Sequence, residues 1–156
     1  MAGLDSEIVE RKLGYLRRFL GDLGGYASLD APGRRREHYA IERLLQLLCE
    51  SAADIALQIL KRQGETLPAS YREVFRALER AGTLPADIAT ELVAACGMHN
   101  VLTHLNDEID LERVIAAVDQ AIALYRRFMD WVIERLREDG DSAAGRGADE
   151  AERPLA

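Results

Sequence analysis

Residues 97–110 hold the densest collection of side chains that could carry acid–base chemistry. The stretch reads GMHNVLTHLNDEID and contains His99 and His104, two of only three histidines in the chain. An imidazole gains and loses its proton near neutral pH, which suits a general acid or a general base. These residue types therefore favour proton transfer on a bound polar substrate.

On an α-helix, the polar residues of this stretch fall in one sector. At about 100° per residue, His104 lies about 140° from His99, with Thr103 and Asn100 between them and the apolar residues on the opposite arc. Residues 97–106 carry no formal charge, whereas other exposed faces of the chain are rich in charged residues. An uncharged polar face indicates a helix that lines a cleft or packs against a partner. A solvated face is the alternative.

A basic cluster is the second candidate for substrate contact. Arg34, Arg35 and Arg36 are consecutive and form the densest group of positive charge in the chain. Guanidinium groups bind phosphate oxygens, so this cluster could contact a nucleic-acid backbone. Three arginines in a solvated loop are the commoner explanation of such a run.

A zinc site is the competing chemical interpretation of the histidine stretch. Its ligands would be Cys96, His99 and His104. Since His104 is turned by about 140° from His99 on one helix, a single ion cannot easily take both, and no fourth ligand is evident. We expect neither a metal nor a bound cofactor, because Gly-rich phosphate loops and paired-cysteine motifs are also absent from the sequence.

Length and composition limit the class of protein that positions these residues. The chain has 156 residues, of which 48% are apolar and 30% are charged, and its net charge is −7. These values indicate one soluble domain and argue against a general polyanion-binding surface, although a local basic groove is compatible with them. Cys49 and Cys96 fall in apolar helical stretches and should be reduced, and no segment resembles a signal peptide or a membrane span. We therefore expect a cytoplasmic protein with no membrane contact.

Apolar residues at three- and four-residue spacing predict helices throughout. Five helices are expected, at about residues 6–23 and 36–62, from Ser70 onward, from Pro85 to His104, and from Leu111 to Arg137. The expected architecture is an all-α, up-and-down bundle over residues 1–138. Residues 139–156 have no periodicity and should form a disordered acidic tail.

Three segments resemble the HepT-like branch of the HEPN family, whose members are helical toxins paired with a minimal nucleotidyltransferase antitoxin. They read YAIERLLQLLCESAADIALQIL, LPASYREVFRALERAGTLP and GMHNVLTHLNDEIDLERV, and the likeness spans most of residues 8–135. The resemblance implies a homodimer that is a metal-independent RNA endonuclease, with its cleft where the histidine-bearing helices of two protomers meet.

The family signature places an arginine, usually followed by asparagine, five positions before a histidine and seven before a tyrosine. Here Asn100 and His104 match, His99 stands at the arginine position and Asn106 at the tyrosine position. The resemblance implies that His104 is the general acid or base, Asn100 an orienting amide, and Thr103 an RNA contact.

The two departures change the expected chemistry. Histidine lacks the permanent charge and the bidentate geometry of arginine, so His99 would be a weakened phosphate contact. Alternatively, His99 and His104 could act together as acid and base. In the family the antitoxin attaches AMP to the signature tyrosine, and Asn106 has no hydroxyl to accept it.

Supporting residues and a rival function follow from the same resemblance. In the family fold the second helix packs beside the histidine-bearing helix, so Asp54 could orient His104 or His99, with a solvated polar stripe as the alternative. Asn106 would be a further supporting residue. The rival function is a catalytically inactive HEPN-fold binding protein that still pairs with a nucleotidyltransferase.

Overall fold

Six helices and no strand make up the described part of the chain. The computed structural model describes the backbone of residues 6–104 and 111–151, and the side chains of residues 7–97 and 111–140. The helices are α1 (Ser6–Ala27), α2 (Ala31–Arg36), α3 (His38–Arg62), α4 (Tyr71–Arg80), α5 (Ala86–His104) and α6 (Leu111–Ala151). The predicted all-α class is confirmed, but the predicted count of five helices is wrong by one.

The additional helix is α2, which lies in the segment that we expected to be a connection. Asp30 caps it, because its carboxylate accepts a hydrogen bond from the backbone nitrogen of Gly33 at 2.8 Å. Pro32 occupies the first turn, where its missing N–H costs nothing. Helix α1 also continues past Gly24 and Gly25, which we had expected to end it. Local capping thus produces a short helix where the apolar pattern predicts none.

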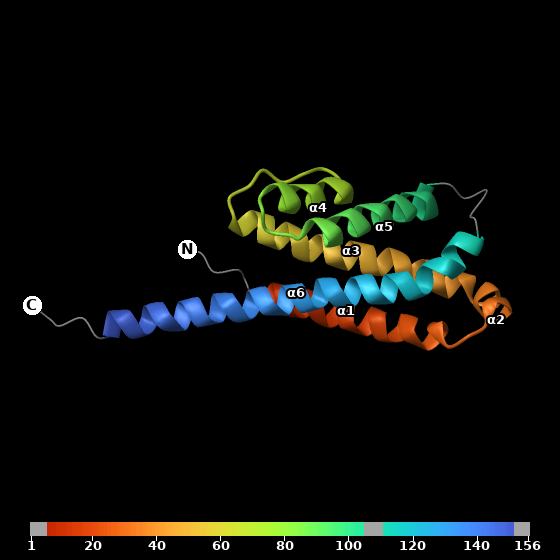
Figure 1. Cartoon of the computed structure of the whole chain (residues 1–156), viewed down its shortest axis with the longest axis horizontal. Coiled ribbons are helices and arrows are strands. Elements are labelled where there is room, and N and C mark those ends of the chain that lie inside the picture. The colour runs from red at the N-terminus through yellow and green to blue at the C-terminus, as the bar shows by residue number, and fades with distance from the viewer. Residues whose placement is uncertain (1–5, 105–110, 152–156) are drawn as a thin grey trace, which may run out of the picture.

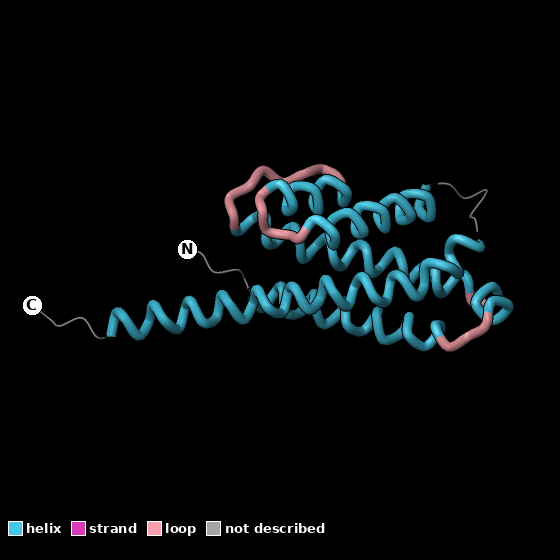
Figure 2. The backbone as a smooth tube through the Cα atoms, in the orientation of Figure 1, coloured by secondary structure: helices cyan, strands magenta, loops and turns pink. Residues whose placement is uncertain are grey.

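The long helices alternate in direction, as in an up-and-down bundle. In Figure 1, α1 and α5 run one way along the long axis and α3 and α6 run the other way. The short helix α4 lies beside α5, and α2 lies at the end where α5 finishes and α6 begins. Figure 2 shows that loops are confined to the ends of the bundle. This arrangement collects α2, the start of α3, the end of α5 and the start of α6 at one end.

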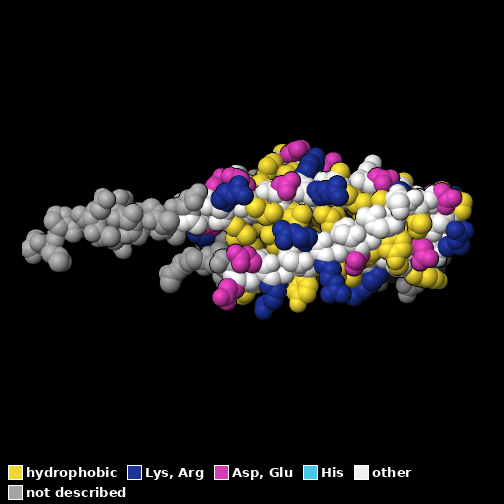
Figure 3. Space-filling view, turned by 90° about the horizontal axis from the view of Figure 1, so that it is seen from below, with side chains coloured by type: hydrophobic (Ala, Val, Ile, Leu, Met, Phe, Trp, Pro, Cys, Tyr) yellow, Lys and Arg dark blue, Asp and Glu magenta, His cyan; other side chains and the backbone are white. Residues whose placement is uncertain are grey.

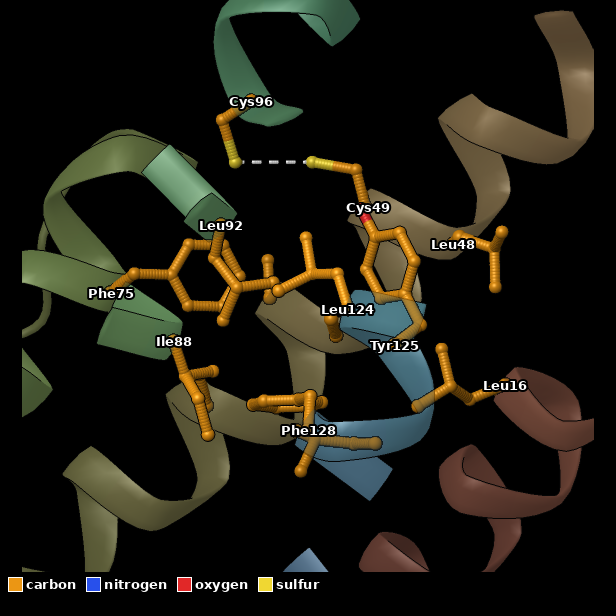
Figure 4. Packing of buried hydrophobic residues seen from close by; sticks show 14 of the residues in the cluster. Leu16, Leu48, Cys49, Phe75, Ile88, Leu92, Cys96, Leu124, Tyr125 and Phe128 are labelled. Atoms are coloured by element: carbon orange, nitrogen blue, oxygen red, sulfur yellow. Dashed lines mark hydrogen bonds between the residues drawn. The ribbon is translucent and has the colours of Figure 1, made fainter. Parts of the chain in front are cut away.

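The core lies between α1, α3, α4, α5 and α6. Among its fully buried large side chains are Leu16, Leu48, Phe75, Leu92, Tyr125 and Phe128, several of which Figure 4 shows in contact range of one another. The rings of Phe75 and Phe128 meet edge to face, with centroids 6.3 Å apart, and so join α4 to α6. Burial of apolar area of this kind stabilises the bundle more than helix propensity does.

The end of α3 and the start of α4 lie where the sequence predicts them. The Ser70 hydroxyl accepts a hydrogen bond from the Glu73 backbone nitrogen at 3.3 Å and caps α4. Gly64 follows α3 with φ +72°, a conformation that glycine adopts without strain. The Glu65 nitrogen then donates to the Leu60 carbonyl, which closes the helix. Short-range sequence signals therefore locate these two boundaries correctly.

Helix α6 extends beyond the point where we placed the end of the bundle. It runs without a break from Leu111 to Ala151, so the boundary predicted at residue 138 does not coincide with a helix end. In Figure 1 its last turns project past the other helices. The sequence from residue 139 lacks apolar periodicity, but it contains alanine, glutamate and arginine, which favour helix.

The described helices include no membrane span, and one side of the molecule carries mixed charge. No helix in the described residues is long and apolar enough to cross a membrane. On the side shown in Figure 3, lysine and arginine side chains are interspersed with acidic and apolar ones. Charge is therefore distributed on this face, as expected for a chain with net charge −7.

Candidate active site at the end of helix α5

The predicted site residues occupy the last two turns of α5. The backbone of this helix continues through His99, Asn100 and Thr103 and ends at His104. Side chains are described only up to residue 97 in this helix, and Asn106 lies outside the described residues. The roles assigned to these five residues therefore stay predictions, and the structure contributes the surroundings of the helix end.

A contact between two cysteines sets the register of α5 against α3. The sulfur atoms of Cys49 and Cys96 lie 3.1 Å apart and both thiols are buried and free (Figure 4). Because α3 and α5 are antiparallel, residues after Cys96 lie at the level of residues before Cys49. His104, eight residues after Cys96, is about 12 Å further along the axis of α5, and in Figure 1 α5 diverges from α3 toward this end.

The first turns of α3 carry a hydrogen-bonded pair, His38 and Glu42. Glu42 is 6% exposed, and its carboxylate lies 3.0 Å from the Nδ1 atom of His38, one turn earlier on the same helix. On the other side of the imidazole, the Tyr39 ring has its centroid 4.0 Å away. A titratable pair thus lies in the first turns of α3.

The basic cluster of α2 lies at the same end, but its three arginines have different surroundings. Arg34 is only 12% exposed and donates to the carbonyls of Ala27 and Ile115 and to both carboxylate oxygens of Asp119. It therefore joins α1, α2 and α6.

The other two arginines of α2 are more accessible. Arg35 is paired with Glu112 at 2.7 Å, and the side chain of Arg36 is exposed. Arg36 is thus the most accessible of the three to a phosphate group, and Arg34 is the least.

Comparison with known proteins assigns this chain to a known family. The family model described as Ribonuclease HepT-like matches residues 9–132, from the start of α1 to well within α6. The chain belongs to the HepT-like family. Among curated HepT-like relatives, the tRNA nuclease HepT of Aphanizomenon flos-aquae (strain 2012/KM1/D3) is 27% identical over 147 residues, which cover 90% of this chain and all of the relative.

A second relative and two solved structures agree with this membership. The mRNA nuclease HepT of Shewanella oneidensis is 28% identical over 86 residues, covering 55% of this chain and 65% of the relative. A structure of the toxin–antitoxin MntA–HpeT matches with a TM-score of 0.73 at 21% identity, covering 82% of this chain and 98% of the other. The Bacillus subtilis cytosolic protein YutE matches with a TM-score of 0.75 at 17% identity, covering 89% and 95% of the two chains. At these identities the structures establish the HepT-like fold alone.

This HepT-like chain has an apolar groove between α5 and α6. Its volume is about 540 Å³ and alanines form much of its floor, including Ala94, Ala95, Ala117 and Ala121. Glu91 and Arg127, which form an ion pair, stand at one end, and Arg113 also lines the groove. Small side chains allow close approach of another helix, so the groove is suited to protein contact.

Asp54 does not lie with the histidine-bearing end of this HepT-like bundle. It is five residues after Cys49 on α3, which in the antiparallel register is the direction away from His104. Its carboxylate pairs with Lys12 of α1 at 3.4 Å, and it contributes to raising the pKa of Tyr71, of which partial burial is the main cause. Along the helix axis, Asp54 is about 18 Å from Glu42.

The contact between His38 and Glu42 was not predicted from the sequence. Both lie in the second predicted helix, but neither belongs to the apolar stripe that defines its buried face. One signal was available, since Glu42, Leu45 and Cys49 share an i, i+3, i+7 spacing and therefore one side of the helix. The burial of Glu42 depends on tertiary packing, which helix periodicity alone does not reveal.

Proposed function

We propose that this chain is the toxin of a toxin–antitoxin module and acts in the cytoplasm as an RNA endonuclease that needs no metal ion. The observation that carries the proposal is the full-length likeness to a tRNA nuclease, combined with a histidine at the last residue of α5. His104 is its acid or base and Asn100 orients the substrate. The RNA that it cuts belongs to the class of single-stranded or loop RNA, where the 2′-hydroxyl is free to align for attack.

The reaction needs three functional groups at this helix end. A base takes the proton of the 2′-hydroxyl, an acid protonates the leaving 5′ oxygen, and a cation stabilises the charge on the phosphate. Histidine supplies the first two functions near neutral pH. His99 and Thr103 contact the phosphate, with help from Arg35 and Arg36 on the neighbouring helix α2.

The proposed assembly is a homodimer neutralised by a minimal nucleotidyltransferase. The alanine-lined groove between α5 and α6 supports the dimer, because it lets a second copy approach the helix that carries His104. The antitoxin partner is proposed from the toxin–antitoxin structures with which this chain shares its fold. Since Asn106 cannot accept AMP, neutralisation uses another residue or blocks the cleft.

The first experiment is cleavage of labelled total RNA in the presence of EDTA. Wild-type protein, His104→Ala and Lys61→Ala are compared, since Lys61 is exposed at the far end of α3 and serves as a matched surface control. We expect wild type and Lys61→Ala to cut at equal rates and His104→Ala to be slower by a factor of about a hundred or more. Equal cutting by all three proteins would contradict the role of His104.

A second candidate function is an inactive HEPN-fold protein that binds a nucleotidyltransferase. The observation that favours it is the presence of His99 and Asn106 where the family signature has arginine and tyrosine. Absence of cutting by folded, dimeric wild type, together with stable binding to a minimal nucleotidyltransferase in a pull-down of purified proteins, would support this second function over the first.

A further inference from the structure

Tyr39, near the start of α3, has the most exposed large apolar side chain among the described residues. It is 77% exposed, compared with 49% for Tyr15 on α1. A single exposed aromatic residue needs no explanation by itself. Tyr39 differs from an ordinary exposed tyrosine because its neighbours hold the ring in place while most of the ring stays open to solvent.

The support of the Tyr39 ring reaches down into the bundle. The imidazole of His38 packs against it, with the ring centroids 4.0 Å apart and the ring planes 38° apart. The Nδ1 atom of His38 in turn donates to the Glu42 carboxylate at 3.0 Å, and Glu42 is 6% exposed. Burying a carboxylate is unfavourable unless it is paired. The buried carboxylate therefore fixes the imidazole, and the imidazole supports the exposed ring.

Positive charge flanks the ring. Residues 34–43 include four arginines and two glutamates, in a chain whose net charge is −7. The first two of these arginines are paired with acids of α6, but Arg36 and Arg43 are both exposed. Arg43 is one turn after Tyr39 and so lies on the same side of α3, and Arg36 is three residues before it. Glu37 is the exposed acid of this segment.

An exposed ring between two guanidinium groups suits single-stranded RNA. Bases of a single strand have free faces that stack on aromatic side chains, and the phosphates between them bind arginine. A protein partner also favours tyrosine and arginine, but charged residues are depleted from the centre of such interfaces. The exposed residues next to Tyr39 are charged, so the surface fits RNA better.

We propose that the exposed ring of Tyr39 stacks on a base of single-stranded RNA and that Arg36 and Arg43 bind neighbouring phosphates. We call these three residues the stacking platform. The inference rests on the proposed function and deepens it, because it gives the RNA an anchor outside the candidate active site. The platform is complete within α2 and α3 and needs no residue of α5.

The binding test uses full-length variants that are first shown to fold by circular dichroism and urea unfolding. The ligand is a short, fluorescently labelled single-stranded RNA with methylated 2′ oxygens, which cannot react, and fluorescence anisotropy gives its Kd. Tyr39→Ala should raise Kd by about tenfold, the usual effect of losing one stacked base, whereas Tyr39→Phe keeps the ring and the wild-type Kd. Tyr15→Ala, at an exposed tyrosine that stacks on Phe19, is the matched control and should also keep it. A wild-type Kd for Tyr39→Ala would overturn the proposal.

Removal of the bases from the RNA distinguishes stacking from a structural effect. The same oligonucleotide is prepared with abasic sites in place of its bases. The resulting increase in Kd should be about tenfold larger for wild type than for Tyr39→Ala, because the variant has no ring on which a base can stack. Equal increases for the two proteins would show that Tyr39 does not stack on a base and would overturn the proposal.

His38 is tested as the support of the ring. His38→Ala should raise Kd by a smaller factor than Tyr39→Ala, and His38→Phe, which keeps a ring beside Tyr39, should recover most of that loss. An equal loss in both His38 variants that follows their loss of stability would assign His38 a structural role only and overturn its part in the proposal.

The two arginines are tested by the salt dependence of binding. Each phosphate contact contributes a slope of about 0.7 to the dependence of log Kd on log salt for single strands. Arg36→Ala and Arg43→Ala should each lower the slope by about that amount. Lys61→Ala, which removes a positive charge at the other end of α3, should leave it unchanged. An unchanged slope in both arginine variants would overturn their contact with phosphate.

Cleavage of unmethylated RNA by the same proteins separates this inference from the proposed function. If wild type does not cut but its binding depends on Tyr39, the proposed activity fails and the stacking platform stands. If wild type cuts and Tyr39→Ala binds and cuts equally well, the activity stands and the platform is overturned. A Tyr39→Ala protein that keeps its RNA affinity but loses binding to a minimal nucleotidyltransferase would assign this surface to a protein partner and also overturn the proposal.

Discussion

The sulfur atoms of Cys49 on α3 and Cys96 on α5 lie 3.1 Å apart and share a hydrogen bond. Cys96 is three residues before His99 in the chain. This contact sets how far α5 reaches along α3. Asp54, five residues after Cys49, therefore lies toward the end of α3 that is away from the C-terminal end of α5.

The two thiols should be unreactive in the folded protein. Both are buried, and the hydrogen bond between Cys49 and Cys96 and, next, burial raise the pKa of the Cys49 thiol far above its ordinary value, so little thiolate forms. We expect an aromatic disulfide reagent to label neither cysteine of native protein at neutral pH within minutes. The same reagent in concentrated urea should label both at once, and rapid labelling without urea would show that α3 and α5 separate readily.

Stability should fall at alkaline pH. The pKa of Cys49 is raised above 9.0 in the folded state, and burial raises the pKa of Tyr125 well above 10.0. Above these values the unfolded chain releases protons that the folded chain retains, so the stabilising contribution is complete below pH 9 and is lost as pH rises further. Urea unfolding at a series of pH values measures this decline.

A double variant provides the control for the alkaline decline. Cys49→Ala with Tyr125→Phe should be less stable than wild type at pH 7, because cavity and packing losses remain. Its free energy of unfolding should nevertheless decline less steeply between about pH 9 and pH 11. Parallel curves for the two proteins would mean that other groups cause the decline.

Replacing Arg34 should lower the stability of the fold, whereas replacing Arg36 should weaken RNA binding. Arg34 is nearly buried and donates hydrogen bonds to a carbonyl of α1 and to a carbonyl and a carboxylate of α6, so Arg34→Ala should lower the free energy of unfolding by about 2–3 kcal/mol. Arg36→Ala should change it by less than about 0.5 kcal/mol, since the residue is exposed. Urea unfolding measures both, and fluorescence anisotropy with labelled RNA should show weaker binding for Arg36→Ala at unchanged fold.

Restoring the signature arginine should raise the cleavage rate. His99→Arg supplies a permanently charged, bidentate donor for the phosphate, and removal of one such donor commonly slows a reaction by about a hundredfold or more. We expect an increase of about tenfold or more in kcat/KM on labelled RNA. His99→Lys, with a charge of different shape, is the matched control and should raise the rate less. A slower His99→Arg protein would indicate that His99 already takes part in proton transfer.

Local sequence signals predict most of the fold of this protein. The Ser70 cap, the left-handed Gly64 and the apolar stripe of α6 act over one to three turns, so neighbouring residues suffice to specify them. The polar sector at the end of α5 is equally local, and its placement on a helix is as predicted. The extra helix α2 was missed because its cap at Asp30 operates without an apolar stripe.

Only the tertiary structure decides what surrounds that sector. From the sequence alone, Arg34 is one of three equivalent arginines. Packing distinguishes it, because Ile115 and Asp119 of α6 accept hydrogen bonds from its guanidinium group. The burial of Glu42, which is 6% exposed, is likewise not evident from the sequence. The physical reason is range: helix formation depends on residues a few positions apart, whereas burial and ion pairing here join residues up to 85 positions apart. The sequence alone determined the helices and the chemistry that they could carry, and the tertiary contacts decided which side chains share the site.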